Sequence, residues 1–302
     1  MQEPPLGRDL EDRLRRLNEI GAALSLEHDL DTLLDRILLA ARRFTNADAG
    51  TLYLLQGQEL TFKIAQNDTL QLFSGGPHGP ADVPPVPLNE QSASGYAALM
   101  GETLNIVDVY AEEAPQRFEG PRYYDSMTGY HSQSMLVVPM RDHEEQIIGV
   151  LQLINAKVSG SDEIAAFSTT DESLVQSLAS QASVSINNVR LIEDTQRLFQ
   201  SFVHVMATAI DERSPYTGGH IRRVTEMTMF VARAVNDCKE GPLQDIELDF
   251  DELEELELAA WMHDIGKITT PEWIVDKPTK LTTIYDRIDL LRTRFAWFAA
   301  TV

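Results

Sequence analysis

Two histidines and an aspartate are the residues of this sequence best suited to chemistry. His263 and Asp264 are adjacent in the segment Ala260–Lys267, and His220 lies upstream in the segment Tyr216–Val224. Imidazole nitrogens and a carboxylate suit a divalent transition metal, and such an ion activates water for hydrolysis. Lys267, three residues after Asp264, is placed to hold a phosphate oxygen. These residues predict metal-dependent hydrolysis.

The helix expected to carry His263 has an apolar face formed by Leu253, Leu256 and Ala260, which His263 shares. This histidine is therefore expected to point toward the core. Burying it beside an aspartate and a lysine without partners would cost several kcal/mol, so a metal or polar site is favoured over chance packing. His204, in contrast, stands among apolar neighbours and is interpreted as an ordinary core histidine.

The composition limits the classes of partner. A length of 302 residues is typical of about two domains, and an apolar content of 43% suffices for globular cores. The net charge of -22 argues against a nucleic-acid polymer and against an anionic membrane surface as partners. A small phosphorylated ligand is still compatible, because one pocket can be locally positive.

Cys238 is the only cysteine, so no intrachain disulfide forms and a reducing compartment is indicated. The N-terminus lacks a signal-like apolar stretch, and no apolar run approaches the about 20 residues that span a bilayer. We therefore expect a cytoplasmic protein with no membrane partner.

The first two thirds of the chain predict an α+β domain. Leucines at helical spacing predict helices over 10–24 and 29–44, and period-two patterns predict a hairpin around 56–59 and strands at 103–107, 134–140 and 146–155. The segment Ser74–Pro87 is rich in glycine and proline and is expected to form either a lid or an exposed connection.

From Asp171 onward the pattern is helical. A stripe at three-four spacing over 175–206 favours either a coiled-coil dimer seam or a helix that packs on its own sheet. Eight of its ten members are apolar: Val175, Leu178, Ala182, Ser185, Val189, Ile192, Gln196, Phe199, Val203 and Met206.

Residues 20–194 resemble a GAF domain of the kind found in cyclic-nucleotide phosphodiesterases and adenylyl cyclases. The resemblance is carried by the segments 94–106, 128–130, 135–140 and 148–155. Asn155, Lys157 and the segment Phe167–Glu172 are similar to a family signature in which a lysine and an aspartate form a structural clasp. The resemblance implies an antiparallel sheet flanked by helices and a small nucleotide-like ligand.

Four polar residues stand in the segments expected to line that ligand pocket: Ser94, Asn105, Asp125 and Thr128. Each is a candidate ligand contact, and for each the alternative is a loop residue that satisfies nearby backbone groups.

From about Phe202 to Leu281 the chain resembles the HD superfamily of phosphohydrolases, specifically its HD-GYP branch. The segments 216–224, 260–267 and 270–282 carry this resemblance. It implies that His220, His263 and Asp264 are ligands of divalent metals, most often iron or manganese, and that Asp264 and Lys267 serve catalysis. The implied substrate is cyclic di-GMP or a related dinucleotide.

The segment also departs from that branch. No histidine and no Gly-Tyr-Pro sequence follows Asp264, and the later aspartates Asp276, Asp286 and Asp289 are interpreted as solvated carboxylates. The chain ends in the apolar segment 295–302, which favours truncation. We therefore expect the HD domain to be partial and this chain to show little or no turnover.

The predicted organisation is an N-terminal helix at 1–19, a GAF sensor domain at 20–194, a connecting helix at 170–206 that favours a homodimer, and part of an all-α HD domain at 202–302. Two functions stay open. One is a GAF-regulated, metal-dependent phosphodiesterase; the other is a dimeric cyclic-nucleotide sensor with an inert HD segment.

Overall fold

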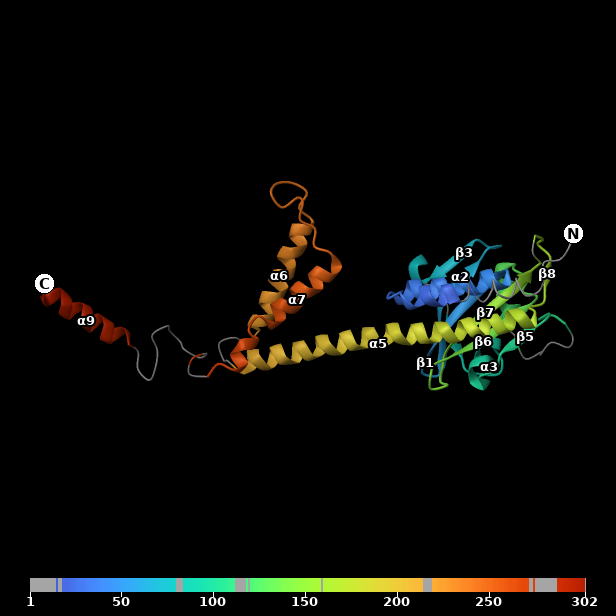
Figure 1. Cartoon of the computed structure of the whole chain (residues 1–302), viewed down its shortest axis with the longest axis horizontal. Coiled ribbons are helices and arrows are strands. Elements are labelled where there is room, and N and C mark those ends of the chain that lie inside the picture. Colours follow the sequence, from blue (N-terminus) through green and yellow to red (C-terminus); the bar gives the residue numbers. More distant parts are fainter. Residues whose placement is uncertain are drawn as a thin grey trace. The chain divides into compact units, whose positions relative to one another are not determined.

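The computed structural model describes residues 15, 18–79, 84–111, 118, 120–158, 160–213, 219–271, 274 and 287–301. The chain forms two compact units, Met1–Glu193 and Asp194–Val302 (Figure 1). No helix in the described ranges has the length and apolar content needed to cross a bilayer. Of the predicted N-terminal helix the structure describes residue 15 and the residues from 18 onward, which are helical to residue 25; Leu10, Leu14 and Leu17 lie outside the described residues.

The first unit is built on one antiparallel sheet with the strand order β3-β2-β1-β7-β6-β5. The predicted hairpin is β1 (Ala47–Gln56) with β2 (Glu59–Asn67), and the predicted later strands are β5 (Leu104–Ile106), β6 (Met135–Arg141) and β7 (Ile147–Lys157). The sheet is extended by β3 (Leu72–Gly75), by β4 (Val86–Pro87) on β2, and by β8 (Ile164–Ala165) on β7.

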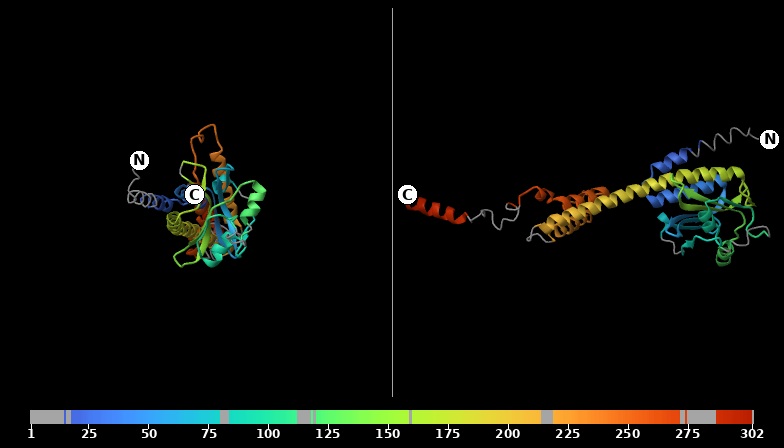
Figure 2. Two further views of the ribbon diagram at one scale, coloured as in Figure 1. Left: turned by 90° about the vertical axis from the view of Figure 1, so that its right-hand side faces the viewer. Right: turned by 90° about the horizontal axis from the view of Figure 1, so that it is seen from below.

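Alternate side chains of each strand enter two separate cores, one on each face of the sheet. Leu136 and Val138 of β6 pack with α2 (Leu30–Thr45) and with the first half of α5 (Thr169–Arg213), which runs beside the sheet in Figures 1 and 2. Met135 and Val137 pack on the other face, in a core that includes residues of α3 (Ala93–Met100) and α4 (Gly120–Thr128). The period-two pattern of the strands thus produces the predicted α+β fold.

The structure of α5 shows that the predicted dimer seam over 175–206 is wrong for the first part of the helix. Five residues of its stripe are buried: Val175, Leu178, Ala182, Ser185 and Val189. All of them except Ser185 belong to the core that α5 shares with α2 and the sheet. This face is therefore not available to a second chain over that stretch, and the alternative that the stripe packs on its own sheet holds there. Further along the same stripe, Ile192 and Phe199 are exposed.

The second unit contains the end of α5, α6 (His220–Asn236), α7 (Phe250–Met262), the 3-10 helix η2 (Ile265–Ile268) and α9 (Ile288–Thr301). Its small core joins Ala207 and Ile210 of α5 to Ile221 of α6 and Trp261 of α7. Asp249 begins α7 with a capping box in which its side chain accepts from the backbone N–H of Glu252.

Of the three late aspartates, Asp289 belongs to the described residues. Asp289 is exposed and pairs with Arg292 at 3.3 Å, which agrees with its interpretation as a solvated carboxylate. Asp276 and Asp286 lie outside the described residues.

Candidate functional site

The structure brings His220, His263 and Asp264 together in the second unit. His220 is the first residue of α6, while His263 and Asp264 follow the last turn of α7. One ligand atom from each residue lies within 4.8 Å of the other two. Asp264 Oδ2 is 3.4 Å from His263 Nε2 and 4.0 Å from His220 Nε2. Because α6 packs against α7, side chains from two motifs that are distant in the sequence lie in one cluster.

The hydrogen bonding of His263 fits the donor set required for a metal ion. Its Nδ1 lies 2.6 Å from the carbonyl oxygen of Ala260, so the Nδ1 proton is donated there. The other ring nitrogen, Nε2, then faces Asp264 and is the atom that would bind a metal. Two imidazole nitrogens and one carboxylate make three protein ligands, which is the number typical of catalytic zinc-type sites that keep a position open for water.

Lys267 lies one turn beyond Asp264, at the end of the same cluster. Its Nζ is 2.5 Å from Asp264 Oδ2, the oxygen that also faces the two histidines. Its side chain is 31% exposed, so the ammonium group borders both the cluster and solvent. The structure thus places all four residues predicted for the HD segment within one small region.

The first unit contains a cavity of about 500 Å³ between the sheet and the segments that include α3 and α4. Its wall includes Ser94, one of the predicted ligand contacts, and residues of the Ser74–Pro87 segment. That segment therefore forms part of the wall, and it includes the 3-10 helix η1 (Gly76–His78) and β4. Among the described residues that line the cavity, none has a charged side chain.

Gln152 is a cavity residue that sequence reasoning missed. Its Oε1 accepts a hydrogen bond of 2.6 Å from Ser94 Oγ, and its Nε2 contacts only the weakly accepting sulfur of Met135, at 3.4 Å, among the described bonds. The available signal was a polar residue in the middle of β7, whose neighbours Leu151 and Leu153 are apolar.

The other three predicted contacts do not line this cavity. Asn105 donates to the carbonyl of Phe167 and to Glu172, and Thr128 donates to the carbonyl of Tyr124. The bond of Thr128 matches the alternative of a residue that satisfies a nearby backbone group, whereas Asn105 lies in β5 and bonds groups 62 and 67 residues away in the sequence.

Asp125 is buried just behind the cavity wall. It accepts hydrogen bonds from Tyr110 and from both the backbone and the hydroxyl of Ser132, a lining residue, at 2.6–2.7 Å. The hydrogen bond to Asp125 is the main cause that raises the pKa of Tyr110 to about 12. Asp125 therefore fixes the position of a wall residue and does not itself face the cavity.

The clasp expected within the signature involves a different aspartate: Lys157 pairs with Asp48, which lies outside the signature, while Asp171 of the signature accepts hydrogen bonds from Ser168. Lys157 Nζ is 2.6 Å from Asp48 Oδ1, and the 3% exposed Asp48 side chain also accepts from Tyr130 and Thr69. Burial alone would raise the pKa of Asp48, but the hydrogen bonds from Lys157, Tyr130 and Thr69 outweigh it, and the pKa is lowered. The hydrogen bond to Asp48 correspondingly raises the pKa of Lys157.

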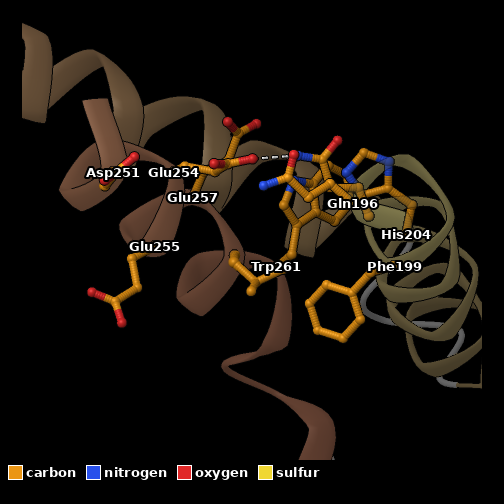
Figure 3. A pocket seen from close by; sticks show the side chains of 10 residues that line it. Gln196, Phe199, His204, Asp251, Glu254, Glu255, Glu257 and Trp261 are labelled. Carbon is orange, nitrogen blue, oxygen red and sulfur yellow. Dashed lines mark hydrogen bonds between the residues drawn. The ribbon is translucent and has the colours of Figure 1, made fainter. Parts of the chain in front are cut away.

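A second cavity, of about 520 Å³, lies in the second unit between α5 and α7 (Figure 3). Its wall has four carboxylates from α7 and the aromatic rings of Phe199, His204 and Trp261. His204 is exposed and its ring centroid is 4.3 Å from that of Trp261, so the interpretation of a buried core histidine is wrong. None of the three candidate metal ligands lines this cavity.

Comparison with known proteins identifies both halves of the chain. The family model of the GAF domain matches residues 29–186, and that of the HD domain matches residues 217–296. A dual 3',5'-cyclic-AMP and -GMP phosphodiesterase of Drosophila melanogaster is 30% identical over 195 residues, which cover 61% of this chain and 12% of that protein. The match thus spans a small part of the relative.

Two solved structures are similar to part of this chain. The GAF domain of an Acinetobacter phosphoenolpyruvate-protein phosphotransferase is 20% identical and covers 60% of this chain and 97% of its own, with a TM-score of 0.45. A fragment of a methyl-accepting chemotaxis protein is also 20% identical, covers 57% and 98%, and has a TM-score of 0.46.

Proposed function

Because the chain belongs to the GAF domain family and carries an HD domain after its GAF domain, we propose that it is a cytoplasmic signalling phosphohydrolase regulated by a small ligand. HD domains are metal-dependent hydrolases, and the candidate ligand set supports a divalent metal. The finer proposal is a phosphodiesterase of the HD-GYP type that acts on cyclic di-GMP or a related dinucleotide, with iron or manganese as the metal.

The observation that carries this proposal is the cluster of His220, His263 and Asp264. These three side chains would hold the metal, which when bound supplies Lewis-acid activation of water. Ala260 keeps the His263 ring in the tautomer that presents Nε2. Lys267 balances the charge of Asp264 and has a solvent-facing ammonium group that would orient a phosphate oxygen of the substrate.

The regulatory ligand would occupy the cavity of the first unit. Residues at the beginning of α3 and of α4 line it, so the positive ends of two helix dipoles offset the absence of cationic side chains. Neutral hydroxyl and amide groups with the rings of Tyr53 and Tyr124 suit a small nucleotide-like molecule with a single negative charge. A homodimer through the connecting helix is part of the proposal.

The test is to measure bound metal and hydrolysis on the same purified chain. We expect one or more equivalents of Mn²⁺ by mass spectrometry, and a slow metal-dependent hydrolysis of cyclic di-GMP or of a chromogenic phosphodiester. The alternative function is a dimeric sensor with an inert HD segment. Absence of bound metal together with tight binding of a cyclic nucleotide would support that alternative and refute the first proposal.

Filling the cavity should separate regulation from catalysis. We expect Ala65→Leu, at a partly buried lining residue, to weaken cyclic-nucleotide binding by about 10-fold or more, since the added carbons occupy ligand volume. Equilibrium dialysis with cyclic AMP and cyclic GMP measures this change. The control is Thr61→Leu on the same strand, at a residue that is also partly buried but does not line the cavity, and equal loss in both variants would contradict a ligand site in this cavity.

A further inference from the structure

The cavity between α5 and α7, called here the α5–α7 groove, combines two kinds of side chain in its wall. Its apolar part is formed by the rings of Phe199, His204 and Trp261, which come from both helices (Figure 3). Phe199 is 51% exposed, so the groove is open to solvent. Four carboxylates of α7 belong to the same wall: Asp251, Glu254, Glu255 and Glu257. A surface that joins aromatic rings to four negative charges is complementary to a partner that is both apolar and cationic.

The helix α9 has that composition. Its apolar residues at successive spacings of three, four and three form one stripe along the helix: Ile288, Leu291, Phe295 and Phe298. Phe295 is 73% exposed and Phe298 is 63% exposed. Each residue of a helix is turned by about 100° from the one before it, which places Arg292 and Arg294 on the two sides of the stripe. The helix α9 therefore matches the groove in both apolar character and charge.

The length and exposure of α9 indicate that it has a binding surface. The helix has 14 residues, and none of its described residues is buried. A helix shorter than about 12–15 residues is only marginally stable in water, and most helices in proteins are stabilised by packing of an apolar face. The exposed stripe is the face of α9 that such packing would cover.

We propose that α9 binds the α5–α7 groove of its own chain. In this bound state Phe295 and Phe298 pack on the rings of the groove, while Arg292 and Arg294 face the carboxylates of α7. The inference goes beyond the proposed function and does not depend on metal binding, hydrolysis or the regulatory ligand, so the two can fail separately.

The chain between η2 and α9 is long enough for this arrangement. Ile288 stands 20 residues after Ile268, the last residue of η2. An extended chain of that length reaches at most roughly 66–72 Å, whereas the α7 side of the groove, from Asp251 to Trp261, is only about 15 Å long. Because groove and helix belong to one chain, the high effective concentration of α9 favours it over a separate partner.

The first arm of the test measures hydrogen exchange of the α9 amides in the whole chain by mass spectrometry. We expect Phe199→Asp to speed this exchange by about 10-fold or more, because it removes a ring of the groove and adds a negative charge without altering α9. The matched control is Phe230→Asp, at a 73% exposed residue of α6 that does not line the groove. It should change the exchange by less than about twofold. Circular dichroism confirms that each variant is folded.

The second arm reverses charges. Arg292→Glu together with Arg294→Glu should speed the exchange of α9 by about 10-fold or more, because like charges would then face one another. Adding Glu255→Arg and Glu257→Arg to the same chain should bring the exchange back to within about threefold of the parent chain, since the facing charges are opposite again. A general effect on the fold would not be reversed in this way.

Dilution separates α9 of the same chain from α9 of a second copy. The exchange of α9 should be unchanged over about 100-fold dilution, whereas binding between copies would weaken by mass action. Four results would each overturn the proposal: fast exchange of α9 in the parent chain, equal exchange in Phe199→Asp and the parent, no recovery in the charge-reversed chain, or loss of protection on dilution.

Discussion

Replacing His263 with alanine is expected to lower the affinity of the chain for Mn²⁺ by about 100-fold or more. The variant removes one of three ligands, and loss of even an outer-shell partner typically costs about 10- to 100-fold in metal affinity. Isothermal titration calorimetry of the apo chain with Mn²⁺ measures the change. Any metal-dependent hydrolysis should disappear with it, since the same site would hold the reactive water.

His204→Ala is the matched control for this experiment. His204 belongs to the same unit, but its ring contacts Trp261 and it is not a member of the metal cluster. Its replacement should leave Mn²⁺ affinity within about twofold, since it lies outside the inner ligand shell. Equal losses in the two histidine variants would indicate a general effect on the fold, and unchanged affinity in His263→Ala would exclude the proposed cluster.

Replacing Asp48 with asparagine is expected to destabilise the first unit by about 3 kcal/mol near neutral pH. The change leaves the ammonium of Lys157 beside a neutral group, and it removes the charged oxygens to which Tyr130 and Thr69 donate. Removing one partner of a buried ion pair typically costs about 3–5 kcal/mol. We expect the lower value because Lys157 is partly exposed. Denaturant unfolding followed by far-ultraviolet circular dichroism measures the effect.

The three tryptophans give this experiment an internal control. All of them lie in the second unit, between Trp261 and Trp297, so tryptophan fluorescence reports on that unit alone. Its transition should not move in Asp48→Asn. Asp162→Asn is the matched variant, because Asp162 lies 3.6 Å from the same lysine but is fully exposed, and it should leave both transitions unchanged. A small effect of Asp48→Asn would contradict a structural clasp.

The pH dependence of this effect follows from the direction of each pKa. The pKa of Asp48 is lowered from 3.8, so its contribution to stability is present above pH 3.8 and is lost as the pH falls through the folded value. The pKa of Lys157 is raised from 10.5, so its contribution is present below pH 10.5 and is lost as the pH rises through the folded value. The variant and the parent chain should therefore converge in stability in strong acid.

The fold was predictable where local pattern and tertiary environment agree. Alternation at Leu52 and Leu54 and the apolar runs of β6 and β7 mark strands because each face of the sheet is covered by helices. The candidate metal cluster was predictable because His263 and Asp264 are adjacent, at the end of α7, and His220 begins α6, the helix that packs on α7.

The other features of the structure depend on tertiary contacts, which the spacing of residues in the sequence does not reveal. A helical stripe at 175–189 has the same pattern whether it meets a sheet or a second chain, and only the tertiary structure shows that it meets the sheet. Asn105 and Thr128 are taken up by nearby hydrogen-bonding groups, and the partner of Lys157 stands at position 48 on another strand. Gln152 faces a cavity whose walls come from segments throughout the first unit.

The charge-free lining of the cavity in the first unit has a consequence for the conditions in which a ligand can be detected. Mobile ions screen attraction between full charges, whereas hydroxyl, amide and aromatic contacts inside an enclosed space are almost unaffected. These contacts should therefore supply an affinity that varies little with ionic strength. Any salt dependence of ligand binding should come instead from the ligand's own charge, which meets the helix N-termini at the cavity and the net charge of -22 on the chain.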